Sequence, residues 1–146
     1  MKVTPVIILI IANVGVYAFT SVAGGSLLFT SQNLIETLGQ DNSRVINGWY
    51  WQLFTSMFVH VDLLHLLGNM FFLLIFGIRA ESLFSKKEFF FIYFASGLSG
   101  NLLTLLMPPS TLSAGASGAI FGMFSASAIY LGKTMGQSIM GALIFS

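Results

Sequence analysis

The chain has 146 residues, of which 55% are hydrophobic and 8% are charged, and its net charge is +1. Soluble domains carry about 25% charged residues, so this chain has too few charges to cover a water-facing surface and is expected to be an integral membrane protein. The near-neutral charge gives no sign of a nucleic-acid-binding protein. The absence of cysteine excludes disulfides, thiolate metal sites and a cysteine nucleophile.

Four segments have the length of membrane-spanning helices, which need about 20 apolar residues each. They are residues 3–23, 57–78, 89–107 and 114–132. A fifth apolar run starts near Ser138 and stops at Ser146, which is too short to span. We therefore expect an all-α, polytopic helix bundle with four full spans and the start of a fifth, forming a single membrane domain over residues 1–146.

The first segment has a second interpretation. Lys2, the apolar run and Ser21-Val22-Ala23 together resemble a secretory signal peptide with a cleavage site. The run is longer than the usual apolar region of about 7–15 residues in such peptides, which favours a retained span. Both interpretations place the loop that follows outside the membrane.

The basic residues predict the orientation. With the N-terminus inside, the outer loops contain only Arg44, and the cytoplasmic segments contain Lys2, Arg79, Lys86, Lys87 and Lys133. This positive-inside bias predicts a multi-pass protein of the cell membrane with a cytoplasmic N-terminus. Residues 24–56 then form a long outer loop, in which residues 33–38 have helical apolar spacing and Trp49-Tyr50-Trp51 favours the headgroup level.

Polar side chains in the second segment are costly inside a membrane and are therefore candidates for a site. His65 and Asn69 are four residues apart, on one face of a helix, whereas His60 precedes His65 by five residues and is expected at the helix entrance. This spacing does not match the i, i+4 histidine pair of a helical zinc site. Two alternatives stay open from these residues alone, namely hydrogen bonds between helices and a polar cluster that faces a reacting group.

The fourth segment opens with Ser117, after the turn that Pro108-Pro109 predicts. A serine at a helix N-terminus is often a cap. The same position also suits a nucleophile, because free N–H groups and the helix dipole there can stabilise an oxyanion. Since the second and fourth segments both enter from outside, we expect His65 and Ser117 to meet in one water-accessible cavity in the outer half of the bilayer.

The fourth segment also carries small residues at every fourth position, namely Ala114, Gly118, Gly122 and Ala126. They form a smooth ridge against which another helix backbone can pack closely. Only three other full spans are expected in the chain, and one of them must also shield His65. We therefore expect a helix absent from this chain to fill the ridge.

Together these features resemble the rhomboid family of intramembrane serine proteases. The resemblance rests on GxSG at residues 115–118 and on the spacing His60-x4-His65-x3-Asn69 in an earlier segment. An aromatic outer loop ending in Trp51-Gln52, and Glu81 just after the second segment, add to it. A lone GxSG is weak, since soluble hydrolases also contain it, but both motifs in this order and orientation cover most of the chain, from about residue 49 to 132.

The resemblance implies a role for each polar residue of the two motifs. Ser117 would be the nucleophile that attacks a peptide carbonyl. His65 and Asn69, together with the backbone N–H of Ser117, would form the oxyanion hole, and His60 would brace the outer loop by hydrogen bonding. No cofactor and no metal are implied. The implied partners are the lipid bilayer and single-span membrane proteins, which would be cleaved near the outer face.

The resemblance also implies a role for the glycines. Gly115 belongs to the nucleophile motif, and Gly118 and Gly122 would let the fourth helix pack against a sixth span that brings the catalytic base. The chain ends before any sixth span and contains no third histidine. We therefore expect a C-terminally incomplete copy that lacks its dyad histidine.

Two further points qualify the resemblance. If His65 served as the base instead, the oxyanion hole would lose a donor worth roughly 3–4 kcal/mol. Gln52 stands where the family often has arginine, which leaves open how the outer loop is held. Two other functions stay as alternatives: a catalytically inactive rhomboid-like protein that binds or escorts transmembrane helices, and a channel or transporter lined by His65 and Asn69. The absence of an inverted repeat disfavours the last one.

Overall fold

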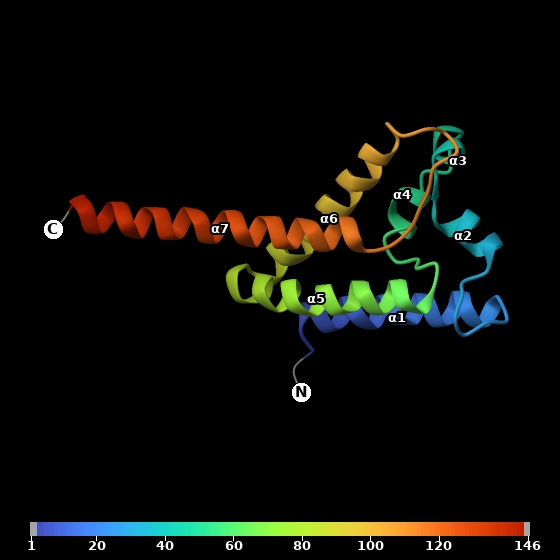
Figure 1. Cartoon of the computed structure of the whole chain (residues 1–146), viewed down its shortest axis with the longest axis horizontal. Helices are drawn as coiled ribbons and strands as arrows, with labels where there is room; N and C mark the ends of the chain where they lie inside the picture. The colour runs from blue at the N-terminus through green and yellow to red at the C-terminus, as the bar shows by residue number, and fades with distance from the viewer. Residues whose placement is uncertain (1–2, 145–146) are drawn as a thin grey trace.

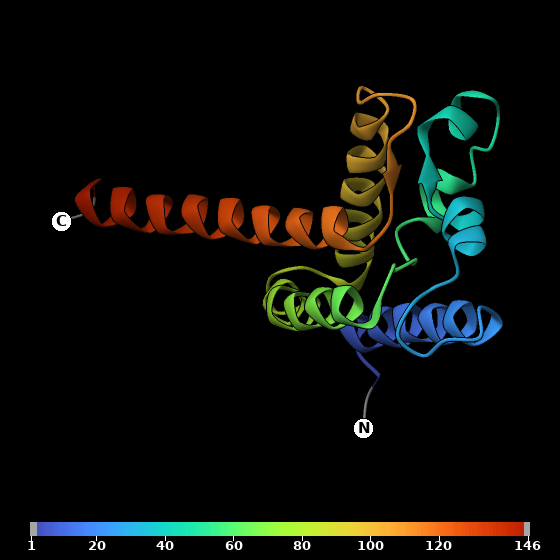
Figure 2. The ribbon, with the colours of Figure 1, turned by 45° about the vertical axis from the view of Figure 1, so that its right-hand side comes forward.

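The computed structural model describes the backbone of residues 3–144 and the side chains of residues 3–136. Four long helices dominate it: α1 (Pro5–Ala23), α5 (Leu63–Leu83), α6 (Lys86–Thr104) and α7 (Ser117–Ile144). Helices α1 and α5 lie side by side and run in opposite directions, and the far end of α7 extends beyond the rest of the fold (Figure 1). Helix α6 crosses the first turns of α7 steeply (Figure 2).

The helical class expected from the sequence is confirmed, with one small addition. Two of the helices, α1 and α5, are long and apolar enough to cross a membrane. Helices α6 and α7 have 19 and 28 residues, but in the described part of the chain they do not reach the same apolar character. Four full spans therefore stay a prediction. The two-residue strands β1 (Gln40–Asp41) and β2 (Leu112–Ser113), which pair antiparallel, were not predicted.

Helix α5 begins later than predicted because a side chain caps it. Asp62 Oδ1 accepts a hydrogen bond from the backbone N–H of His65 at 2.7 Å, which satisfies one of the free donors of the first turn. The residues before Asp62 are therefore outside the helix, and His60 lies at its entrance, as its spacing predicted. The helix continues to Leu83, so the prediction that Glu81 follows this segment was wrong.

Glu81 instead joins the last turn of α5 to the first turn of α1. Its Oε1 atom accepts a hydrogen bond from the backbone N–H of Val6 at 2.6 Å. This N–H is one of the donors that have no partner within α1. The carboxylate also lies at the positive end of the α1 dipole, which stabilises its charge.

Helix α7 differs from the prediction at both ends. It begins at Ser117 rather than at Ala114, because β2 and an extended turn precede it. It passes Gly132 without a break, and the apolar run from Ser138 continues α7 to Ile144. The prediction of a separate fifth segment was therefore wrong for residues 138–144, and residues 145–146 lie outside the described part of the chain.

The small residues at the start of α7 pack against α6. A Cβ atom added to Gly118 would lie 3.9 Å from the Cα atom of Gly97, and one added to Gly122 would overlap the side chain of Ser96. A Cβ atom on Gly100 would in turn lie 3.8 Å from the Cα atom of Gly118. The two backbones thus approach closely through small residues on both helices. Helix α6 therefore contacts the ridge at these two positions, although Gly118 stays exposed, and a further helix from outside this chain stays a prediction.

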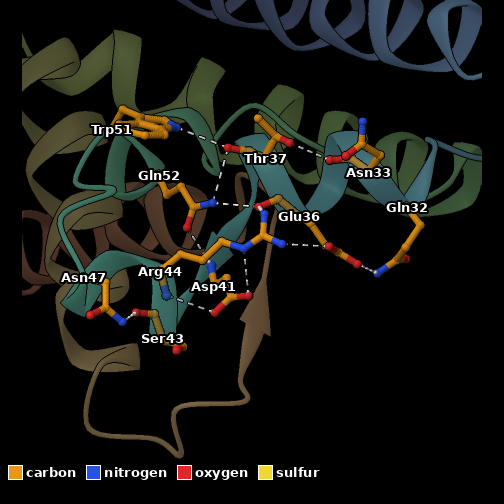
Figure 3. Close-up of polar contacts among 10 residues, drawn as sticks. All are labelled: Gln32, Asn33, Glu36, Thr37, Asp41, Ser43, Arg44, Asn47, Trp51 and Gln52. Carbon is orange, nitrogen blue, oxygen red and sulfur yellow. Dashed lines mark hydrogen bonds and ion pairs between the residues drawn. The ribbon is translucent and has the colours of Figure 1, made fainter.

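The loop after α1 folds into a small module of three short helices, α2 (Gln32–Leu38), α3 (Asn42–Ile46) and α4 (Gln52–Thr55). Helix α2 confirms the helical segment predicted at residues 33–38. The buried side chain of Gln52 links the module (Figure 3): its Nε2 atom donates to the carbonyl oxygen of Glu36 at 2.8 Å, and its Oε1 atom accepts from the backbone N–H of Asp41 at 3.0 Å.

Arg44 reinforces the same junction. Its guanidinium group donates to the carbonyl oxygen of Glu36 at 2.8 Å and to the Glu36 carboxylate at 2.9 Å (Figure 3). It also lies over the ring of Trp49, at 5.0 Å from the centroid. Gln52 and Arg44 therefore share one acceptor, the carbonyl of Glu36. The pair holds α2 against α3 and α4. Gln52 and Arg44 together therefore hold the outer loop, although Gln52 stands where the family often has arginine.

The α6–α7 contact gives the first testable prediction. Gly122→Ala should lower the free energy of unfolding in detergent micelles by about 1–3 kcal/mol, because the new methyl group overlaps Ser96 and forces the helices apart. Gly118→Ala is the matched control and should cause no loss, because its methyl group makes an ordinary contact with Gly97. Equal stability of the two variants would contradict this packing.

The loop module gives the second prediction. Gln52→Met should lower the stability by about 1–3 kcal/mol, because the backbone N–H of Asp41 loses its acceptor in a buried position. The control is Gln32→Met on the exposed start of α2, where the side chain bonds only to the exposed end of Glu36 at 3.0 Å. This change should stay within about 0.5 kcal/mol of the wild type. Thermal unfolding followed by circular dichroism compares the two.

Candidate active site

Ser117 is held at the start of α7 by the backbone of Gly115. The N–H of Gly115 donates to the carbonyl oxygen of Ser56 at 2.8 Å, and Ser56 is the C-cap residue that follows α4. Asn101 of α6 in turn donates to the hydroxyl of Ser56 at 2.9 Å and to the carbonyl of Leu53 at 2.7 Å. The turn that carries Ser117 is therefore fixed to both the loop module and α6.

Gly115 also lies directly against the polar side chains of α5. Its φ of +119° is a conformation that residues with a side chain rarely adopt. A Cβ atom added there would lie 2.9 Å from both Cε1 and Nε2 of His65 and 3.8 Å from Nδ2 of Asn69. The edge of the imidazole that carries Nε2 thus faces the turn before Ser117, and no side chain separates the two.

One cavity, of about 500 Å³, brings the three sequence-predicted residues together. Ser117, His65 and Asn69 line it, and the rest of the lining is apolar or glycine: Leu64, Gly68, Phe72, Phe76, Ile120 and Phe121. Ser117 is exposed to the cavity, His65 is half-buried and Asn69 is buried. The α5 and α7 helices therefore contribute opposite walls of one pocket, as the orientation argument predicted.

The pocket contains a hydroxyl and hydrogen-bond donors, which are two of the elements that an addition to a carbonyl needs. A hydroxyl lies in the first turn of α7, where the backbone N–H groups have no partners within the helix. The imidazole and the carboxamide supply further donors, and one N–H of Asn69 already donates to the carbonyl oxygen of His65 at 2.9 Å. Because the walls are mostly apolar, donors that point into the pocket act in a low dielectric and interact strongly with a developing negative charge.

His60 lies behind His65 rather than in the cavity wall. Its side chain is completely buried in the connection before α5, and its ring centroid is 5.1 Å from that of His65. Burial, with a smaller contribution from neighbouring His65, lowers the pKa of His60 to about 4, so the ring is neutral at physiological pH. Its carbonyl oxygen accepts a hydrogen bond from the hydroxyl of Thr30 at 2.7 Å, which ties the outer loop to this connection.

The sequence interpretation missed Ser56 and Asn101, which position the turn before Ser117. Asn101 could have been found, because it is a polar residue inside an apolar segment, the same signal that singled out Asn69. Ser56 carried no signal, since the atom that accepts from Gly115 is its backbone carbonyl oxygen. Among residues 3–136, whose side chains are described, no group of three or more histidine, aspartate or glutamate residues lies close enough together to hold a metal ion.

Comparisons with known proteins point to one family. A family model described as the Rhomboid domain matches residues 47–144. The chain is similar to RHOMBOID-like protein 6, mitochondrial, from Arabidopsis thaliana, with 37% identity over 112 residues, which is 75% of this chain and 36% of that protein. It is also similar to Rhomboid-like protease 3 from Toxoplasma gondii, with 44% identity over 73 residues, which is 50% of this chain and 28% of that protein.

A bacterial relative is similar over a comparable length. Rhomboid protease GluP from Bacillus subtilis (strain 168) is 34% identical over 103 residues, which is 70% of this chain and 20% of that protein. The aligned regions thus make up between 20% and 36% of the lengths of these three relatives. The names of two of these three relatives describe proteases, and the name of the third places that protein in the mitochondrion.

The contact between Gly115 and His65 gives the third prediction. Gly115→Ala should displace the imidazole of His65, because the new methyl group would lie 2.9 Å from two of its ring atoms. The control is Gly48→Ala, which has a similar φ of +103° but no atom within 4 Å of the added Cβ. Both changes should cost about 1–3 kcal/mol of backbone strain. Only Gly115→Ala should shift the NMR signals of the His65 ring, and an unchanged His65 spectrum would contradict the contact.

Proposed function

The chain belongs to the rhomboid family, and from that premise we propose that it is part of an intramembrane serine endopeptidase, with Ser117 as its nucleophile. The observation that carries the proposal is the cavity between α5 and α7, which Ser117, His65 and Asn69 line together. The two motifs are about 50 residues apart in the sequence. A common cavity is what acyl transfer requires, because the nucleophile and the oxyanion donors must reach the same carbonyl group.

In the proposed reaction, Ser117 Oγ bonds to the carbonyl carbon of a substrate peptide and its proton passes to a general base. The carbonyl oxygen becomes an oxyanion, which accepts hydrogen bonds from the side chains of His65 and Asn69 and from the backbone N–H of Ser117. Collapse of this intermediate breaks the C–N bond, and the leaving amine takes the proton from the base. Water then hydrolyses the acyl-enzyme by the same steps and releases Ser117.

The general base is not assigned to either histidine of this chain. His60 is outside the cavity, and the Nε2 edge of His65 lies against Gly115, where it is placed to donate to an oxyanion. Withdrawing one such donor costs roughly 3–4 kcal/mol of transition-state stabilisation. The family resemblance assigns the base to a histidine on a sixth span, and the proposal requires that group in the whole protein.

The lining of the cavity supports a membrane-protein substrate. Leu64, Phe72 and Phe121 lie on its two sides and are exposed, so the cavity accepts apolar side chains of a transmembrane segment. We propose that the substrates are single-span proteins that unwind near the outer face. In that proposal the protein lies in the cell membrane with its N-terminus in the cytoplasm, in keeping with the distribution of its basic residues.

A specific observation also favours a second candidate, a catalytically inactive protein that binds or escorts transmembrane helices. Among the side chains that the structure describes, Ser117 makes no hydrogen bond to His60 or His65, so neither histidine activates it as placed. A serine hydroxyl without a neighbouring base is a weak nucleophile. A fluorophosphonate probe separates the two candidates in the whole protein, since only an activated Ser117 reacts with it.

The fourth prediction tests the proposed reaction. In the whole protein, reconstituted with a transmembrane substrate, Ser117→Ala should reduce cleavage by about 1000-fold or more, because no covalent intermediate can form. Ser125→Ala is the matched control, since Ser125 is an exposed serine on the same helix and lies outside the cavity. Undiminished cleavage by Ser117→Ala would remove this residue from the mechanism. An absence of both cleavage and probe labelling in the wild type would favour the helix-binding protein.

A further inference from the structure

Two buried ring nitrogens beside the candidate site have no hydrogen-bond partner. They are Nε2 of His60 and Nδ1 of His65, and within the described side chains neither reaches a donor or an acceptor. The two rings are neighbours, with centroids 5.1 Å apart and planes inclined at 63°. A buried polar atom without a partner costs about 1–3 kcal/mol, so two of them side by side indicate a group that bridges both.

The contacts of His60 define what its free nitrogen can do. Its other ring nitrogen, Nδ1, is 3.2 Å from the carbonyl oxygen of Phe58. A carbonyl oxygen can only accept, so Nδ1 of His60 carries the hydrogen. Because burial keeps this ring neutral, Nε2 has a lone pair and is an acceptor.

The position of His65, together with its proposed role in the oxyanion hole, leads to the same conclusion for its free nitrogen. The edge with Nε2 lies against Gly115 and the cavity. In the proposed oxyanion hole this atom must donate, so it must carry the hydrogen. A neutral imidazole that carries its hydrogen on Nε2 has an acceptor at Nδ1. The two buried nitrogens are then both acceptors and cannot bond to each other directly.

We propose that one buried water molecule donates to Nε2 of His60 and to Nδ1 of His65, and that His60 is thereby a positioning residue that holds His65 in its Nε2–H tautomer. Water is the small group with two hydrogens to donate, and buried waters commonly make about three hydrogen bonds to such atoms. The purpose of this tautomer rests on the proposed function, because it aims a donor at the oxyanion. The hydrogen on Nε2 of His65 is taken from the same proposed function, whereas the two unpartnered nitrogens and the closeness of the rings do not depend on it.

The surrounding polar groups leave this arrangement free to form. The carboxylate of Asp62 accepts from the backbone N–H of His65 at 2.7 Å, and the hydroxyl of Thr30 donates to the carbonyl oxygen of His60. Both groups are therefore engaged with backbone atoms rather than with the rings. Of the nearby polar groups, His60 thus contributes the ring contact that selects the tautomer of His65.

The test reads the tautomer directly by ¹⁵N NMR of histidine-labelled whole protein in micelles. The wild type should show His65 protonated at Nε2 and unprotonated at Nδ1. His60→Asn keeps an amide N–H for the carbonyl of Phe58 but has no group at the position of Nε2. It should change the tautomer ratio of His65 on the order of fivefold, the effect of one lost hydrogen bond.

Two further variants separate positioning from general damage to the fold. His60→Gln places an amide oxygen near the position of Nε2 and should restore the wild-type ratio. Thr30→Val removes the other hydrogen bond at His60, that to its carbonyl, and should leave the ratio unchanged. Protonation of Nδ1 in wild-type His65, the same ratio in His60→Asn, or an equal effect of Thr30→Val would each overturn the proposal.

The tautomer measurement does not depend on proteolysis. If Ser117→Ala still cleaved substrate while His60→Asn changed the His65 tautomer, the proposed reaction would fail and the positioning by His60 would stand. If cleavage required Ser117 and the tautomer did not respond to His60, the opposite would hold. The two proposals can therefore fail independently.

Discussion

The site depends on one close contact, the approach of the Gly115 backbone to the imidazole of His65. With φ at +119° and a ring edge where a Cβ atom would stand, this position requires glycine. The N–H of Gly115 is anchored on the carbonyl of Ser56, so the turn cannot move away from His65 without breaking a buried hydrogen bond. Ser117 follows two residues later, and its place in the cavity is set by this anchor.

The other helices and the loop module hold the segments on either side of the contact between Gly115 and His65. Glycines on α6 and α7 let the two helices cross closely, which fixes the direction in which α7 leaves the turn. On the other side, Gln52 and Arg44 close the loop module, and Asn101 joins its last helix to α6. These interactions are far apart in the sequence, yet each of them constrains the position of Ser56 or of Ser117. The candidate site needs these contacts from outside the cavity, because the cavity is lined mostly by apolar side chains and contains few polar groups that could hold Ser117 in place.

The parts of the site that follow local rules could be predicted from the sequence. The four-residue spacing of His65 and Asn69 places them on one face of any helix, and a serine after a turn in an apolar segment indicates a helix start. The apolar segments predicted the helices, with errors of a few residues at the ends. Those errors have local causes that hydropathy does not capture, such as the Asp62 cap that delays α5 and the strand pairing that delays α7.

By itself, the sequence determined the membrane class, the long helices and the residues that could carry chemistry, because composition and periodicity depend on near neighbours along the chain. Only the tertiary structure decided which surfaces meet. The ridge of Gly118 and Gly122 required a close helix partner, but spacing could not say that α6 is such a partner. Likewise, Gln52 alone did not reveal that Arg44 shares its acceptor. Contacts between distant segments depend on three-dimensional packing, which no local pattern encodes.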